Sequence, residues 1–418
     1  MPKDSFTQTG ETTMLKSAWL FITGLILLVM VIDGTACTTV VISGKHTTDG
    51  RAVLWKHRDT SFLQNKLMYF TDGQYDYIGL VNSEDAEGRE VWGGYNSAGF
   101  AIMNSASYNL NINDTTSLKD QEGVLMKKAL QVCTSLADFE QLLRDLPRPL
   151  GVEANFGVID ASGGAAYYET TNFDFRKYDV NDPLVAPHGY LVRSNYSMSG
   201  LIDEGYGYIR YQQADNLFYL GAALKQLDAR YIIRHVTRDL RHALTGVDLS
   251  QNLPSKNPTF VPFEDFIPRY SSVADVIVQG VQTGENAANT MMWTILGFQL
   301  TSVALPVWIQ GGRDLPKVLT ADETGVAPLC DKALKLKDQC FPIKRGSGKR
   351  YLNLAALLNQ EQTGIWQKLQ PLEEQILMET DKQISVWNKK GRQKKDIQSF
   401  YRWLDQTVLD GYQKLFGI

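Results

Sequence analysis

Apolar positions along the chain recur mainly with the period of two that is typical of β-strands. Most of these runs are short, rich in β-branched residues and bounded by turn residues. They predict strands at residues 38–43, 51–59, 66–70, 76–81, 90–95, 99–104, 155–160, 164–169, 189–194, 272–279, 290–297 and 301–309.

Helical spacing of apolar residues appears in three parts of the chain. It predicts helices at 121–132 and 136–145, a long helical stretch at about 207–243 broken near Gly221, and helices from about residue 350 with breaks at Pro371 and Gly391. Residues 246–270 hold four prolines and are interpreted as an extended loop. Strand-rich segments with inserted and appended helices predict an α+β fold of packed sheets covered by helices.

The N-terminus has the layout of a secretory signal peptide. Lys16 precedes an apolar run at 17–32, and Gly34 and Ala36 are the small residues three and one before Cys37. This order of a short basic segment, an apolar run and small residues is typical of a cleaved signal. Cleavage before Cys37 would export the protein to the periplasm or the extracellular space and give a mature chain that begins with cysteine.

Two other fates of this segment stay open. An uncleaved run would anchor the chain in a membrane, although it is short for a membrane-spanning helix. A lipoprotein signal also requires cysteine at the first mature position, but it usually has a large aliphatic residue where this chain has Gly34. Lipidation would exclude catalysis by Cys37, because a thioether with an acylated amine is not a nucleophile.

Composition and charge exclude several classes of function. The net charge is -4, so no basic field points to nucleic acid. The four cysteines and five histidines form no CxxC or HExxH pattern, and we predict neither a metal site nor a cofactor. Cys330 and Cys340 lie in a polar stretch interpreted as a loop, and a disulfide between them stays open for an exported protein.

Local folding of the first hairpin would bring charged residues to Cys37. If Gly44–Gly50 is the loop, Ser43 pairs with Arg51, and Cys37 lies opposite His57. His57 and Asp59 would then share the face of Cys37, with Lys56 and Arg58 on the other face. A slip of one residue would reverse this assignment, so the identity of the neighbouring cation stays open.

An N-terminal cysteine carries a nucleophile and a base in one residue. A free α-amine has a pKa of about 7.7–8.0, so roughly a tenth of it is neutral at pH 7 and able to accept the thiol proton. Attack on a carbonyl creates an oxyanion that needs hydrogen-bond donors. Asn104 and Asn195, at the ends of predicted strands, are candidate donors, whereas Asn96 fits a hairpin turn.

Four motifs together resemble a known group of enzymes. They are Cys-Thr-Thr at 37–39, Asp-Gly-Arg-x-x-x-x-Lys-x-Arg-Asp at 49–59, Gly-Tyr-Asn-x-x-Gly-Phe at 94–100 and His-Gly-Tyr-x-x-Arg-x-Asn at 188–195. Over about residues 37–310 the chain resembles the N-terminal-nucleophile (Ntn) hydrolases of the linear-amide type. These comprise the choloylglycine hydrolase and penicillin V acylase group and the acyl-coenzyme A:6-aminopenicillanic-acid acyltransferase-like group, to which this chain is nearer.

The resemblance implies a four-layer αββα sandwich and an acyl-thioester on the cysteine. By motif position, Cys37 resembles the nucleophile and Asp59 the acid that holds the α-amine. Asn195 resembles the oxyanion-hole side chain, with Asn104 as the second donor.

The resemblance also implies arginines near the nucleophile. Bile-salt and penicillin acylases have one three residues before the acid, where this chain has Lys56, with Arg58 as the alternative. A further arginine, in the helix after the Asn195 strand, corresponds to Arg210.

We therefore predict three regions: an extension and signal peptide at 1–36, an Ntn-hydrolase domain at 37–320, and a C-terminal helical extension at 321–418. The predicted function is exported hydrolysis of a linear amide through an acyl-thioester on Cys37. The alternatives are acyl transfer to an amine and a non-catalytic lipoprotein. The expected partner is a small acyl amide rather than nucleic acid, a membrane contact requires an uncleaved or lipidated N-terminus, and a homo-oligomer stays open.

Overall fold

Strand β1, which contains Cys37, is an inner strand of a six-stranded antiparallel sheet. The computed structural model describes residues 36–418, so the predictions for the signal segment lie outside the described residues. The sheet has the order β10 (Tyr190–Arg193), β1 (Ala36–Ile42), β2 (Val53–Asp59), β12 (Ser272–Gln279), β13 (Met291–Leu296) and β14 (Leu305–Trp308).

A second sheet of seven strands follows the chain order and faces the first. Its strands are β3 (Asn65–Phe70), β4 (Tyr77–Asn82), β5 (Gly93–Asn96), β6 (Ala101–Ala106), β7 (Ala154–Ile159), β8 (Ala165–Thr170) and β9 (Phe175–Asp179). The two sheets approach closely where Val41 meets Gly157, since a Cβ added to Gly157 would lie 2.8 Å from the Val41 side chain. A short ribbon of β11 (Phe260–Pro262) and β15 (Tyr351–Asn353) stands apart.

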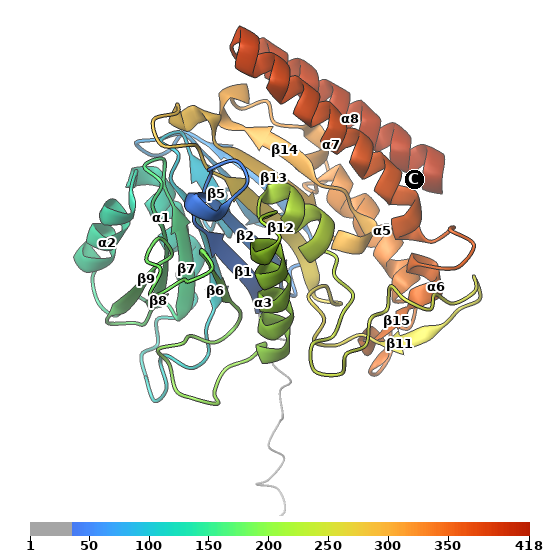
Figure 1. The fold of residues 1–418 in the computed structure, drawn as a ribbon, viewed down its shortest axis with the longest axis horizontal. Coiled ribbons are helices and arrows are strands. Elements are labelled where there is room, and N and C mark those ends of the chain that lie inside the picture. Colours follow the sequence, from blue (N-terminus) through green and yellow to red (C-terminus); the bar gives the residue numbers. More distant parts are fainter. Residues whose placement is uncertain (1–35) are drawn as a thin grey trace, which may run out of the picture. The chain divides into compact units, whose positions relative to one another are not determined.

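Helices cover the outer face of each sheet (Figure 1). Helices α1 (Glu122–Val132) and α2 (Leu136–Asp145) cover the second sheet, where Phe139 packs on Phe156 and Tyr168. On the first sheet, Phe218 of α3 (Tyr208–Ala223) packs against Trp55 of β2. The four layers confirm the predicted αββα sandwich.

The C-terminal helices cover the first sheet near β13 and β14. They are α5 (Pro328–Cys340), α6 (Leu354–Leu357), α7 (Ile365–Lys390) and α8 (Lys394–Phe416). Trp308 of β14 packs edge-on against Trp387, and its backbone N–H donates to the Tyr401 hydroxyl over 2.7 Å. The predicted C-terminal helical region is confirmed, whereas its division from residues 37–320 as a separate domain stays a prediction. Within residues 36–418, no helix is both long and apolar enough to cross a membrane.

Most predicted elements exist, and the exceptions have physical reasons. Strand β9 was not predicted, because it is half-exposed and carries Arg176 and Lys177 among few apolar residues. The predicted break at Pro371 is wrong, since α7 continues through this residue. The predicted long helix ends at Ala223 and resumes only as the short α4 (Ala229–Tyr231) and a π-helical turn at Ile232–Val236.

The stretch around Cys330 and Cys340 is a helix rather than the expected loop. The two cysteines are the third and last residues of α5, and both thiols are buried and free. Ten helical residues rise about 15 Å, far beyond the Cα separation that a disulfide allows. The structure therefore excludes the disulfide that the sequence left open.

This geometry predicts two free thiols on α5. Alkylation of the denatured protein without a reductant should modify both Cys330 and Cys340, which peptide mass spectrometry can measure. Cys133, buried after α1, provides the control because it too is free. A disulfide-linked peptide containing Cys330 or Cys340 would contradict the helix geometry.

Candidate active site

The pairing of β1 with β2 differs by one residue from the predicted hairpin. Cys37 lies opposite Arg58 rather than His57, and Ala36 lies opposite Asp59. Cys37 is only 5% exposed. Because directly opposed residues share a face, Arg58 and Lys56 lie on the face of Cys37, and His57 and Asp59 lie on the other. The predicted assignment of faces is therefore reversed.

The reason for the shift is the shape of the β1–β2 connection. A 3₁₀ turn at Gly44–His46 is capped by Ser43, whose Oγ accepts from Lys45 N. The Thr47 hydroxyl lies 3.1 Å from the Gly44 carbonyl and 2.9 Å from the Arg51 carbonyl. This folded connection leaves Ile42 paired with Val53 instead of closing the predicted tighter loop.

Lys56 is buried and fixes the orientation of Asn104. Its Nζ donates to Asn104 Oδ1 over 2.6 Å, and it lies 5.7 Å from the centre of the Trp92 ring. Since lysine can only donate, Oδ1 must face Lys56. Asn104 Nδ2 has no partner among residues 36–418 and is a free donor. Burial lowers the pKa of Lys56 to about 8, although the charge of Cys37 raises it.

Arg58 is a second buried cation on the face of Cys37. Its guanidinium donates to Asn65 and, over 2.9 Å, to Asn82, and it lies 4.8 Å from the Trp92 ring centre. Burial lowers the pKa of Arg58 to about 10, whereas the charge of Cys37 raises it. Both candidate cations thus lie where they would stabilise a thiolate.

Asn195 and Arg210 hold the backbone of Cys37. Cys37 N donates to Asn195 Oδ1 over 3.0 Å, and Arg210 donates to the same oxygen over 2.8 Å. Arg210 also donates to the Cys37 carbonyl over 2.8 Å and to the Thr38 hydroxyl over 2.7 Å. Because Arg210 only donates, the atom facing Cys37 N must be the amide oxygen.

This orientation limits the predicted role of Asn195 in an oxyanion hole. Asn195 Nδ2 donates to the Ala106 carbonyl over 2.9 Å, which leaves one N–H for another acceptor. In the uncut chain, Cys37 N is a peptide nitrogen and stands where a free α-amine would be after cleavage. Asn195 and Arg210, predicted from distant motifs, are both brought to Cys37.

Asp59 lies at the cross-strand position next to Cys37 and is completely buried. Arg269 donates to Asp59 Oδ2 over 3.1 and 2.8 Å, and the Ser272 hydroxyl donates to Oδ1 over 2.5 Å. Burial alone would raise the pKa of Asp59, but the charges of Arg269, His57 and Arg210 outweigh it and lower the pKa below its ordinary value.

A buried polar chain continues behind Asp59. His57 Nε2 lies 2.9 Å from the Ser272 hydroxyl, and His57 Nδ1 lies 3.2 Å from Asp275 Oδ1. Trp55 Nε1 donates to the same Asp275 oxygen over 2.6 Å. Sequence reasoning did not identify Arg269, Ser272 and Asp275, because they reach the site through the pairing of β12 with β2, which no local pattern indicates.

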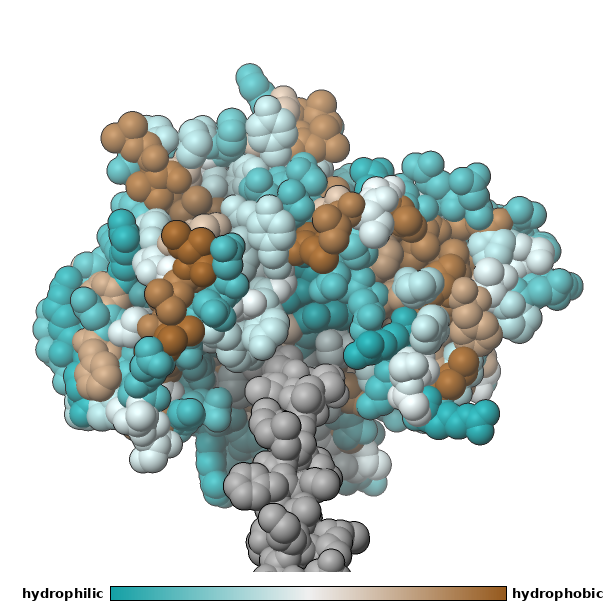
Figure 2. Space-filling view, turned by 90° about the horizontal axis from the view of Figure 1, so that it is seen from below, coloured by the Kyte–Doolittle hydropathy of each residue, from teal (hydrophilic) through white to brown (hydrophobic). Residues whose placement is uncertain are grey.

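Exposed apolar side chains follow Asn195 along the chain. The loop from β10 to α3 and the first residue of α3 expose five large apolar or aromatic side chains by 46–88%: Met198, Leu201, Ile202, Tyr206 and Tyr208. It returns to the site, because Asn195 and Tyr206 exchange backbone hydrogen bonds. On the face seen from below, apolar patches are separated by hydrophilic residues (Figure 2).

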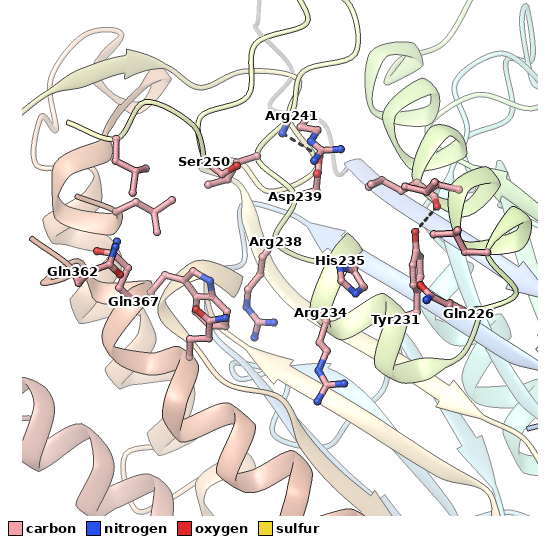
Figure 3. Close-up of a pocket in the computed structure, with 18 residues that line it drawn as sticks. Gln226, Tyr231, Arg234, His235, Arg238, Asp239, Arg241, Ser250, Gln362 and Gln367 are labelled. Atoms are coloured by element: carbon pink, nitrogen blue, oxygen red, sulfur yellow. Dashed lines mark hydrogen bonds between the residues drawn. The ribbon is translucent and has the colours of Figure 1, made fainter. Parts of the chain in front are cut away.

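A well-formed cavity lies away from Cys37. It has a volume of about 470 Å³ and lies between the second half of α3, the π-helical turn and the start of α7 (Figure 3). Phe263 and Phe266, in the predicted loop at 246–270, do not line this cavity, because they are buried and stack on each other in the core.

The pairing of Asp59 with Arg269 predicts a pH-dependent stability. Asp59→Asn should lower the free energy of unfolding by about 3 kcal/mol at pH 7, because it leaves buried cations without their counter-charge. The folded pKa of Asp59 is depressed, so this contribution is complete above the ordinary pKa of about 3.9 and declines as the pH falls further, through the folded pKa.

Urea unfolding of both proteins between pH 7 and pH 3 measures this difference. Asp410→Asn, an exposed change on α8, is the control and should change stability little at any pH. A difference for Asp59→Asn that stays constant or grows below pH 4 would contradict the assigned direction of the pKa.

Comparison with known proteins finds similar solved structures. No protein-family model matches the chain, and no curated protein matches it in sequence. A Caenorhabditis elegans ortholog of N-acylethanolamine-hydrolyzing acid amidase is 14% identical over 60% of this chain and 96% of that one, with a TM-score of 0.39. Penicillin V acylase from Agrobacterium tumefaciens is 13% identical over 65% and 86%, with a TM-score of 0.38.

A third structure is a mutant of the conjugated bile acid hydrolase from Clostridium perfringens. It is 11% identical over 65% of this chain and 92% of that one, with a TM-score of 0.40. Identities and TM-scores this low carry no argument about the reaction, which must come from the site itself. Amide hydrolases of the kind that the sequence motifs resemble, the Ntn hydrolases of the linear-amide type, are among the solved structures to which this chain is similar.

Proposed function

We propose that this protein is an exported amidohydrolase whose nucleophile is Cys37, freed as the N-terminal residue by cleavage after Ala36. The observation that carries the proposal is the hydrogen bond of 3.0 Å from Cys37 N to Asn195 Oδ1, an oxygen that Arg210 also holds. This contact fixes the orientation of the Cys37 nitrogen, and an α-amine that accepts the proton of its own thiol needs a fixed orientation. The substrate is a small linear amide with an acyl group.

Attack begins with the transfer of the Cys37 thiol proton to its own α-amine. Sγ then bonds to the amide carbonyl carbon, and the carbonyl oxygen becomes an oxyanion. Lys56 and Arg58, on the same face, stabilise negative charge at Sγ before attack. Asn104 Nδ2 and the remaining N–H of Asn195 are the donors available to the oxyanion.

Collapse of this intermediate breaks the carbon–nitrogen bond. The α-ammonium gives its proton to the leaving amine, and the acyl group stays on Sγ as a thioester. Water then attacks the thioester carbonyl, the α-amine accepts a proton from it, and the thiol leaves with that proton. Asp59, opposite the residue removed by cleavage, is suited to hold the α-ammonium in both half-reactions.

The burial of Cys37 supports catalysis over lipidation. At 5% exposure, its side chain lies between the two sheets, where a diacylglycerol group on Sγ would have to displace packed residues. The exposed apolar loop after Asn195 supports a substrate with an apolar acyl group. Acyl transfer to an amine shares every step up to the thioester, and products formed with and without an added amine distinguish it from hydrolysis.

The proposal predicts the identity of the nucleophile. N-terminal sequencing of the secreted protein should begin at Cys37, and iodoacetamide should label Cys37 alone in the native protein. The other three thiols are unreactive, because burial raises the pKa of Cys133 to about 12, of Cys330 to about 11 and of Cys340 to about 12.

Variants separate catalysis from the alternatives. Cys37→Ala should lose both labelling and amide hydrolysis, while Cys133→Ala should keep both. A Cys37→Ser protein with full activity, a mature chain that begins elsewhere, or a diacylglycerol mass on the N-terminal peptide would refute the proposal.

The proposal also predicts the effect of removing an oxyanion donor. Asn104→Ala should lower kcat by about 10²–10³-fold with little change in KM, since the donor acts on charge that develops only in the transition state. Steady-state kinetics on a hydrolysed acyl amide measure this split. Asn257→Ala, in an exposed loop, is the matched control, and an unchanged kcat for Asn104→Ala would remove Asn104 from the mechanism.

A further inference from the structure

The cavities differ in how their arginines are paired. In the larger cavity of Figure 3, every lining arginine has a carboxylate partner. The ion pairs are Arg234–Glu374 at 2.8 Å, Arg238–Glu373 at 2.5 Å and Arg241–Asp248 at 3.1 Å. Nothing in that cavity therefore requires an added anion.

A second cavity of about 300 Å³ lies at the other end of β2 from Cys37. It is lined by residues before β2, by residues 228–230, by the 279–291 segment, by Trp308, and by the second half of α7 with Arg392 after it. Two of its three arginines are neutralised within the cavity wall. Arg51 pairs with Glu285 at 2.6 Å, and Arg230 pairs with Asp381.

Arg392 is the third arginine, and it has no such partner. It follows Gly391 in the short connection between α7 and α8. Among residues 36–418 its guanidinium makes no hydrogen bond or ion pair, and Nε and Nη1 are buried. Its Cζ lies over the Trp308 ring, 5.5 Å from the ring centre, and over the Trp387 ring, 5.2 Å from the ring centre.

The guanidinium of Arg392 therefore lacks hydrogen-bond acceptors within the described part of the chain. Arginine stays charged in proteins and offers five N–H donors in its plane, whereas the neighbouring aromatic rings supply no oxygen or nitrogen acceptor. A buried donor without an acceptor costs about 1–3 kcal/mol, and more when the group is charged. Four carboxylates line the cavity, and each is bound elsewhere. Glu285 and Asp49 lie against Arg51, and Asp381 pairs with Arg230. Asp228 accepts from the Thr48 hydroxyl and Tyr231 N, so no carboxylate bonds to Arg392 among residues 36–418.

We propose that this cavity binds a small oxyanion, a carboxylate or a phosphate, on the guanidinium of Arg392. Both groups offer oxygen acceptors to several N–H donors at once, which is the geometry that arginine favours. The site is separate from the chemistry, because the seven residues of β2 span about 23 Å between the cavity and Cys37. It does not depend on the proposed reaction. Bound anion would join the α7–α8 connection to the first sheet.

The test titrates sodium phosphate and, separately, sodium acetate into the purified full chain at constant ionic strength set with sodium chloride. Thermal unfolding should show a saturable rise in Tm for at least one of the two anions, because a ligand that binds only the folded state stabilises it. Tryptophan fluorescence should change over the same concentrations, since Trp308 and Trp387 contact Arg392. The anion that acts distinguishes phosphate from carboxylate.

Matched variants connect the response to Arg392. Arg392→Gln should weaken binding at least tenfold. Its Tm should then change only linearly with anion concentration, without saturation. Arg402→Gln, an exposed change on the adjoining helix α8, should bind as the unchanged protein does. The proposal is overturned if neither anion gives a saturable response, or if Arg392→Gln binds as tightly as the unchanged protein.

Discussion

The antiparallel pairing of β1 with β2 sets the positions of all groups around Cys37. Because Cys37 opposes Arg58 and Ala36 opposes Asp59, the cations and the acid lie on different faces of one sheet. The face between the sheets holds the thiol with Lys56 and Arg58. The opposite face, below α3, holds the charges that act on the backbone nitrogen. A shift of one residue would exchange these sets and separate the thiol from its cations.

The charges on the two faces have different partners. On the outer face, the Asp59 carboxylate forms an ion pair with Arg269, and the positive charge of Arg210 also stabilises it. Negative and positive charges therefore compensate one another there. On the inner face, Lys56 and Arg58 have amide oxygens and the Trp92 ring as neighbours, and no carboxylate among residues 36–418 bonds to them. Two buried cations without a bonded anion make this the place where a thiolate or an oxyanion is stabilised most.

Local sequence patterns predicted much of the fold, because burial on one side of a strand imposes a period of two that survives in single sequences. They failed where that signal is weak, as in the half-exposed β9, or where tertiary contacts dominate, as in α7 across Pro371. The site divides in the same way. Motifs identified Cys37, Asn195 and Arg210, whereas Ser272 and Asp275 depend on a strand pairing more than 200 residues away. The face of Lys56 depended on the length of one connection, which the hairpin count underestimated.

The location of the Ala36–Cys37 bond has a consequence for the proposed cleavage after Ala36. Both residues are buried in β1. Ala36 pairs with Asp59 of β2, and Cys37 pairs with Arg58 of the same strand. A protease needs several extended residues free of other pairing, so this bond is closed to it once the sheet has formed. A cut by another enzyme must come before β1 joins the sheet, and a later cut must be made by the folded chain itself. If the proposed cleavage after Ala36 activates the chain, folding before the cut leaves self-cleavage as the remaining route to activity.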